Sequence, residues 1–162
     1  MSKIKLLILL SFSFILGSCT STNRSNYQFK LDYIGGGADG LIYSNYLNAY
    51  LKSLNMFNNS SDYSIDTSMT HQQTVFITNV NNTSDREMIT SKIVTKINDN
   101  LKNCIVLEYS DDVQQQYVIA SNINFTSNNK AVNSIKRSNT EILTKKMVYF
   151  LSQIENFECV NN

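Results

Sequence analysis

Apolar side chains recur along this chain with two different periods, one typical of strands and one typical of helices. Residues 27–33 alternate between apolar and polar side chains, and the same alternation runs through residues 62–78. A two-residue period indicates a strand with one buried face. Shorter alternating runs at residues 105–109 and 117–125 predict further strands of the same sheet.

Two other segments repeat their apolar residues every three or four positions, which is the spacing of one helix face. The first covers residues 41–57 and follows the glycine-rich stretch 35–40, which we interpret as a flexible turn. The second begins near residues 127–129, extends to about Asn156 and carries a basic flank opposite its apolar face. The expected core positions are Tyr43, Tyr46, Leu47, Tyr50, Leu51 and Leu54 in the first helix, and Ala131, Val132, Ile135, Ile142, Leu143, Val148, Leu151 and Ile154 in the second.

Residues 86–97 fit both periods. Ser84 and Glu87 are spaced as in a capping box, and isoleucines recur every four residues, which supports a helix. The same isoleucines also share one face of a strand, and the segment is rich in Ile, Thr and Val, which favour strands. We assign these residues to a strand.

Polar clusters predict where the strands are interrupted. We expect the long strand 62–78 to bend or bulge near Gln72 and Gln73, where both faces are polar. Ser110, Asp111 and Asp112 should break or bulge the strand that starts at residue 105, because adjacent carboxylates are common in turns. Residues 117–125 should then continue the sheet.

The predicted order is strand, helix, several antiparallel strands, helix. This order favours an α+β fold, a two-layer sandwich with a mainly antiparallel sheet and both helices packed on one face. A single domain over residues 27–157, followed by a short tail at 158–162, accounts for all the patterned segments.

The first nineteen residues have a different pattern. Lys3 and Lys5 precede an apolar run over residues 6–15, which is too short for a permanent membrane span and suits a secretion signal. The run ends in Leu16-Gly17-Ser18-Cys19, which resembles the lipobox of bacterial lipoproteins. The resemblance implies removal of residues 1–18, acylation of Cys19 and a polar tether over residues 19–26. Because Thr20 follows the cysteine rather than an aspartate, we expect an anchor on the periplasmic face of an outer membrane.

Composition excludes several function classes. Loss of the signal would leave 12 basic and 13 acidic side chains, which gives no basic face for nucleic acid. Residues 35–40 satisfy G-x-G-x-x-G, but the series of strand-helix crossovers that a dinucleotide fold needs does not follow, so no cofactor is expected. His71, the single histidine, has no sequence partner that would make a catalytic or metal site, and we interpret it as a strand residue. We therefore expect a protein that is not an enzyme.

Cys104 and Cys159 remain as thiols once Cys19 is acylated. An oxidising envelope allows a disulfide between them, which would tie the last residues back onto the domain. Two separate small apolar residues are the alternative, because sequence spacing alone does not give the distance between the two sulfur atoms.

Taken in order, these segments resemble the LPS-assembly lipoprotein family LptE. The resemblance covers the lipobox, the helix through Tyr50 and Leu51, the long strand starting Tyr63-Ser64-Ile65, a polar hairpin leading to Arg86, and a late strand at residues 122–126 before a long final helix. Residues 83–87 and 131–137 are similar to one branch of the family. The chain departs from the family in having Cys19-Thr20-Ser21 where Cys-Gly-Phe is common, and in having no proline.

The resemblance implies a lipoprotein that plugs an LptD-like outer-membrane β-barrel, helps this barrel to assemble and contacts lipopolysaccharide on its way to the outer leaflet. Arg86 and Lys130 match the basic positions associated with that contact, and Lys136 and Arg137 belong to the same basic helix flank. Guanidinium and ammonium groups pair well with lipid phosphates, although solvated surface charges are the alternative for each of the four. A lipoprotein that activates a peptidoglycan synthase, or an auxiliary subunit of an envelope lipid-transport complex, is the competing interpretation of the same small α+β domain.

Overall fold

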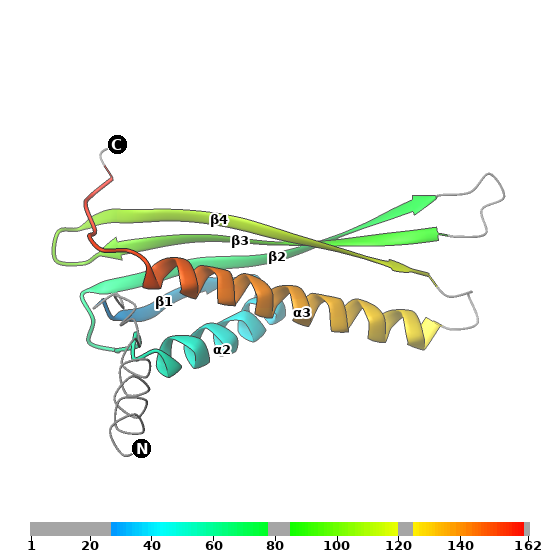
Figure 1. The fold of residues 1–162 in the computed structure, drawn as a ribbon, viewed down its shortest axis with the longest axis horizontal. Helices are drawn as coiled ribbons and strands as arrows, with labels where there is room; N and C mark the ends of the chain where they lie inside the picture. Colours follow the sequence, from blue (N-terminus) through cyan, green and yellow to red (C-terminus); the bar gives the residue numbers. More distant parts are fainter. Residues whose placement is uncertain (1–26, 78–84, 120–124, 161–162) are drawn as a thin grey trace, which may run out of the picture.

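The computed structural model describes residues 27–77, 85–119 and 125–160, which form one sheet covered on one face by two helices (Figure 1). The chain therefore has the α+β architecture that its periods predict. The elements are, in order, β1 (Phe29–Gly35), α2 (Gly37–Ser53), β2 (Tyr63–Ile77), β3 (Asp85–Asp99), β4 (Cys104–Val118) and α3 (Phe125–Ser152).

The sheet has the strand order β1-β2-β3-β4. The short strand β1 runs parallel to β2, whereas β2, β3 and β4 form a long antiparallel meander. The segment that fitted both periods is a strand, as predicted. It pairs on both sides, from Tyr63 opposite Asp99 to Ile77 opposite Asp85 on β2, and with β4 on its other edge.

Two predicted interruptions are wrong. The register between β2 and β3 passes Gln72 and Gln73 without a shift, so β2 has no bulge there. β4 is also continuous through Asp111 and Asp112. Neighbouring strand residues point to opposite faces, so the two carboxylates do not face each other. Asp111 pairs with Lys146 of α3 at 3.0 Å, and Asp112 lies opposite Lys92 of β3, so each carboxylate has a basic neighbour on its own side.

Both helices start before the positions that periodicity predicts. α2 starts at Gly37 because Gly36 adopts a left-handed φ of 112°, which turns the chain sharply out of β1. α3 begins at Phe125 and ends at Ser152, so residues 125 and 126 belong to this helix and not to the expected late strand.

The core lies between the two helices and the sheet, along the part of the long strands where β1 pairs with β2. Tyr43, Leu47 and Leu51 of α2 are fully buried against β-strand side chains that include Ile65 and Ile93. Leu143, Met147, Val148 and Leu151 complete the core from α3. Each fully buried Leu or Met side chain contributes about 1.5–3 kcal/mol of hydrophobic stabilisation.

Several polar side chains of α3 are buried between this helix and the rest of the domain. Asn139, Thr140 and Thr144 of α3 are at most 1% exposed, although sequence periodicity placed them outside the apolar face. The hydroxyls of Thr140 and Thr144 each donate to the carbonyl oxygen four residues earlier, at 2.7 Å, so their burial leaves no donor unsatisfied. Tyr43 donates to the sulfur of Met147 at 2.9 Å, and burial raises the pKa of this tyrosine to about 12.

One end of the sheet is closed by the C-terminal tail. Cys104 and Cys159 form a disulfide, with their Cα atoms 5.7 Å apart. Phe157 is held beside Tyr27, whose ring centroid lies 4.5 Å away. The described chain therefore enters and leaves the domain at this end, which we call the disulfide end. None of the described helices combines the length and the hydropathy needed to cross a membrane.

Candidate functional site

The four basic residues singled out from the sequence lie in two different places. Arg86 is near the start of β3, between Phe76 of β2 and Val118 of β4, and Lys130 is in the second turn of α3. Both positions belong to the end of the sheet opposite the disulfide end, where α3 begins, which we call the distal end (Figure 1).

Arg86 and Lys130 do not lie on the same layer. The side chain of Glu87 is buried on the helix side of β3, where the Tyr117 hydroxyl donates to its carboxylate. Because strand side chains alternate, Arg86 lies on the opposite face of the sheet from α3. The two basic side chains are therefore exposed on the two sides of the distal end.

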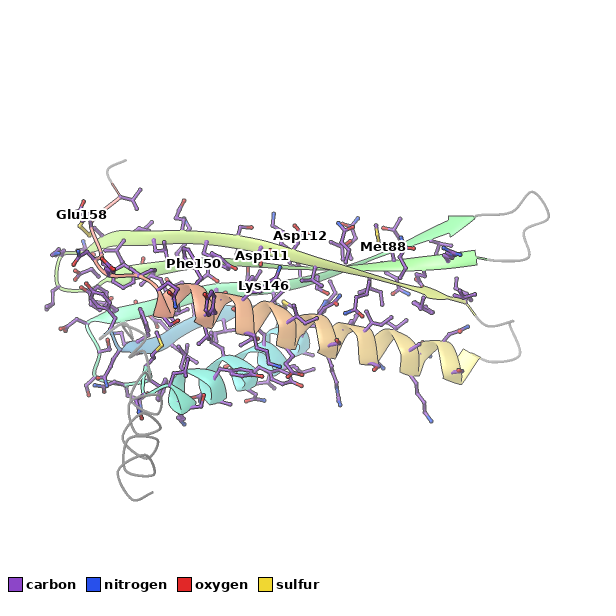
Figure 2. The ribbon with its side chains drawn as sticks, in the orientation of Figure 1. Met88, Asp111, Asp112, Lys146, Phe150 and Glu158 are labelled. Atoms are coloured by element: carbon purple, nitrogen blue, oxygen red, sulfur yellow. A yellow bond between two sulfur atoms is a disulfide. The ribbon has the colours of Figure 1, made fainter. Side chains whose placement is uncertain are left out.

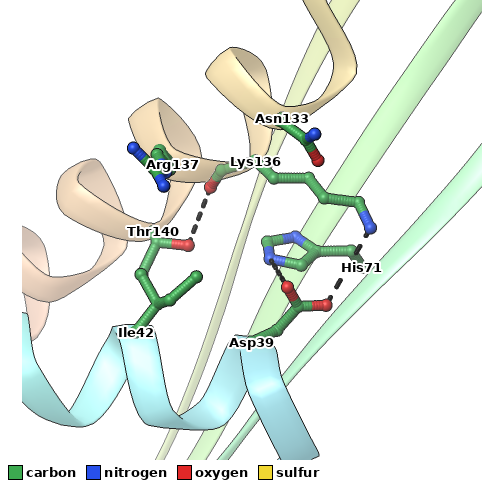
Figure 3. A pocket seen from close by; sticks show the side chains of 7 residues that line it. All are labelled: Asp39, Ile42, His71, Asn133, Lys136, Arg137 and Thr140. Atoms are coloured by element: carbon green, nitrogen blue, oxygen red, sulfur yellow. Dashed lines mark hydrogen bonds and ion pairs between the residues drawn. The ribbon is translucent and has the colours of Figure 1, made fainter. Parts of the chain in front are cut away.

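Lys136 and Arg137 instead line a pocket of about 220 Å³ between α2, β2 and α3 (Figure 3). Asp39 from the first turn of α2 sits between two partners in this pocket. Its carboxylate oxygens lie 3.9 Å from Lys136 Nζ and 4.0 Å from His71 Nε2. Both distances exceed the 2.7–2.9 Å of a charge-assisted hydrogen bond. Lys136 and Asp39 therefore form a weak ion pair, and His71 makes only a long polar contact with Asp39. The complete lining is Asp39, Ile42, His71, Asn133, Lys136, Arg137 and Thr140.

His71 is the buried centre of this arrangement. Its side chain is 2% exposed, and its Nδ1 atom lies 2.7 Å from Ser91 Oγ on the neighbouring strand. The Asn139 amide donates to the same Ser91 oxygen at 2.9 Å. Burial lowers the pKa of His71, opposed by the Asp39 charge and aided by the Lys136 charge. A neutral imidazole that accepts from Ser91 keeps its Nε2 proton on the side of Asp39.

The pocket has the groups to hold an anion. Lys136 and Arg137 supply two cations, and Asp39 offsets one of them. The hydroxyl of Thr140 is engaged with the carbonyl of Lys136, which leaves it poorly placed as a nucleophile. Within residues 27–77, 85–119 and 125–160, no group of three or more His, Cys, Asp or Glu side chains is placed to hold a metal ion.

Sequence reasoning missed Asp39 and Asn139 as parts of this pocket region. Asp39 had one signal, because an acidic residue in the first turn of a helix is favoured by the helix dipole. No sequence signal indicated Asn139, because this residue is buried only where α3 packs on β3 and its amide reaches Ser91. Cys19 and the segment before Tyr27 lie outside the described residues.

The sequence matches no protein-family model and no curated protein. The fold, however, is similar to solved structures of bacterial proteins. A minor lipoprotein from Acinetobacter baumannii aligns with a TM-score of 0.61 at 14% identity, over 83% of this chain and 96% of that protein. A lipoprotein from Caulobacter crescentus aligns with a TM-score of 0.55 at 13% identity, over 76% of this chain and 87% of its own.

Rare lipoprotein B from Shewanella oneidensis shares the same architecture at still lower identity. It aligns with a TM-score of 0.58 at 5% identity, over 76% of this chain and 92% of that protein. At these identities the similarity establishes the fold and leaves the activity to be argued from the residues of this chain.

Proposed function

We propose that this protein is an outer-membrane lipoprotein that plugs and helps to assemble an LptD-like β-barrel and contacts lipopolysaccharide as it enters the outer leaflet. The strongest support is the combination of two independent observations. The chain combines a lipobox-like segment ending at Cys19 with a fold that aligns over most of its length with three proteins named as lipoproteins.

The shape of the domain supports a role inside a barrel. β2, β3 and β4 each have 15 residues, and strands of this length extend about 50 Å. A bilayer with its headgroups is about 40–45 Å thick. Because the described chain enters the sheet at the disulfide end, a lipid on Cys19 would hold that end near the periplasmic membrane surface. The distal end could then extend along a barrel lumen toward the outer leaflet.

The charges at the distal end support contact with lipopolysaccharide. Arg86 and Lys130 are exposed on opposite sides of this end, and each can pair with a phosphate group. Lys136 differs from them, because it is partly buried at 29% exposure and already lies 3.9 Å from Asp39. We therefore assign the primary contact to Arg86 and Lys130, and a secondary one to Lys136 and Arg137.

Purification of the tagged protein from detergent-solubilised outer membranes tests this function. A large β-barrel should co-purify in stoichiometric amount, and depletion of the protein should lower both the correctly assembled barrel and the surface lipopolysaccharide. An unrelated lipoprotein with the same tag and anchor is the control for non-specific capture. Recovery of a peptidoglycan synthase or a lipid-transport complex in place of a barrel would refute the proposal.

A further inference from the structure

The outer edge of β4 is long and regular. β3 pairs with one edge of β4 over nearly all of its 15 residues, and the sheet ends there, since β4 is last in the strand order. From Leu107 to Val118 the register has no shift. Among the described residues outside the sheet, only Val160 forms a backbone hydrogen bond to β4, with its N–H donating to Ile105 at the disulfide end.

This edge lacks several of the usual protections against strand addition. Proteins commonly protect such edges with proline, lysine or bulges. β4 contains no proline and no lysine, and its bulge lies near the disulfide end, between the partners of Ile97 and Asn98. An edge of this kind can pair with an extended segment of another chain.

Charges on the outer face of the sheet alternate from strand to strand toward this edge. Asp66 of β2 lies opposite Lys96 of β3, which lies opposite Glu108 of β4, with 2.8 Å between Lys96 Nζ and Glu108 Oε1. Four residues along, Lys92 lies opposite Asp112. Each row therefore ends on an acidic residue at the edge, and the next strand in the series would meet Glu108 and Asp112. Opposite charges on directly opposed strand positions are favourable, and like charges are unfavourable.

The helix side of the same edge is aromatic. Tyr109 of β4 stacks on Phe150 of α3, with ring centroids 4.9 Å apart. Phe150 is still 39% exposed, and Tyr149 beside it is 68% exposed. Figure 2 shows Phe150 and Lys146 on α3 alongside the part of β4 that carries Asp111 and Asp112. An added strand would therefore meet carboxylates on one face and exposed aromatic surface on the other.

We propose that the β4 edge binds an extended segment of a partner protein, with Lys or Arg opposite Glu108 and Asp112 and an apolar side chain against Tyr109 and Phe150. Backbone hydrogen bonds supply the attachment, and the alternating basic and apolar side chains supply the selectivity. A second copy of β4 fits poorly, because full-length antiparallel pairing would place Asp111 against Asp111. This edge interaction is separate from lipopolysaccharide contact at Arg86 and Lys130.

The sequence of β3 provides a suitable probe, because β3 already pairs with β4 in the required register. A synthetic peptide of residues 86–97 carries lysines at the positions of Lys92 and Lys96. On its other face it places Thr95 opposite Tyr109, with Ile93 and Ile97 on either side of this threonine. It should bind the purified full-length chain in detergent and slow amide hydrogen exchange in residues 107–118. A second peptide with Lys92→Glu and Lys96→Glu should bind at least tenfold more weakly.

A charge swap makes the test specific. The double variant Glu108→Lys/Asp112→Lys should prefer the glutamate peptide to the lysine peptide. The variant places lysines opposite Lys92 and Lys96 of β3, and this repulsion should cost little because the Lys96–Glu108 pair is about half exposed. An unchanged circular dichroism spectrum checks that the variant is folded. The variant Glu155→Lys/Glu158→Lys makes the same charge change on the exposed tail and should keep the original preference. No binding, equal affinity for both peptides, or protection outside β4 would each overturn the proposal.

Discussion

Cys104, the first residue of β4, is bonded to Cys159, which follows the end of α3 by seven residues. The bond spans a sequence separation of 55 residues and ties the tail across the disulfide end. Cross-linking a loop of this size limits the unfolded chain, with a typical stabilisation of about 2–4 kcal/mol. We expect Cys104→Ser/Cys159→Ser to lose about this much unfolding free energy in urea denaturation.

The same variant supplies the control for reduction. A reducing agent should destabilise the natural protein and leave the double serine variant unchanged. Reaction of Cys104 and Cys159 with maleimide in the denatured, unreduced protein would contradict the disulfide.

His71 should make stability depend on pH. Burial holds the pKa of His71 below its ordinary value of 6.5, so the unfolded chain takes up a proton at a pH where the folded protein does not. Stability should therefore be unaffected by this group above pH 6.5 and should fall as the pH drops below it, by at most about 1.4 kcal/mol per pH unit. The loss should level off below the pKa of the folded state.

The variant His71→Asn isolates this contribution, because its amide can still bond to Ser91 but does not titrate. The difference in unfolding free energy between the two proteins, measured from pH 8 to pH 5, should shrink on the acid side. A constant difference across this range would show that His71 titrates alike in both states.

Two adjacent glycines before α2 should respond very differently to alanine. A Cβ at Gly36 would lie 2.3 Å from the carbonyl oxygen of Met69, at a φ of 112°, so Gly36→Ala must move either β2 or the helix start. At Gly37 the φ is 60°, and a Cβ would meet no atom within 4 Å. We expect a loss of more than about 3 kcal/mol for Gly36→Ala and about 1 kcal/mol for Gly37→Ala. Equal melting temperatures for the two variants would contradict the close approach.

Periodicity was sufficient to predict both helices, strands β1 to β3 and the two layers, because burial against one partner layer imposes a period of two on strands and near four on helices. It also resolved β3 correctly, since Ile89, Ile93 and Ile97 are fully buried on one strand face. The errors arose where polar residues occupy regular structure. Asp111 and Asp112 sit within a continuous strand because Lys146 and Lys92 lie on its two faces.

The pocket could not be predicted in the same way. Asp39, His71 and Lys136 come from three elements separated by tens of residues, and only the crossing of α2 and α3 over β2 brings them together. The basic flank of α3 was interpreted as one surface, yet Lys136 lies in this pocket and Lys130 is exposed near the start of the helix. Charge patterning shows which residues share one face of a helix, but it does not show which other elements pack against that face.

The proposed lipid anchor requires the thiol of Cys19. Replacement of Cys19 by Ser should leave an unprocessed precursor that takes up no palmitate label and is lost from the outer-membrane fraction. Ser18→Ala keeps a small residue before the cysteine and should be processed and labelled as the natural protein is. Normal processing of the Cys19 variant would reject the lipobox interpretation.

Lipopolysaccharide binding should depend on the charges of the distal end. Each charge-assisted pair with a phosphate contributes about 1.5–3 kcal/mol, and tenfold in affinity corresponds to about 1.4 kcal/mol. Arg86→Glu/Lys130→Glu should therefore weaken binding to the full-length chain by at least tenfold, with unchanged helix content in circular dichroism. Lys136→Glu should have a smaller effect on affinity, because Lys136 already shares Asp39 with His71.

A matched variant separates a site from general charge attraction. Lys52→Glu/Lys102→Glu makes the same change in net charge near the disulfide end, at the end of α2 and in the turn between β3 and β4. Its affinity should fall by less than about threefold at physiological salt, because exposed charges far from the ligand are screened beyond about 8 Å. Equal losses in the two double variants would show that lipopolysaccharide responds to total charge, and would remove Arg86 and Lys130 from the site.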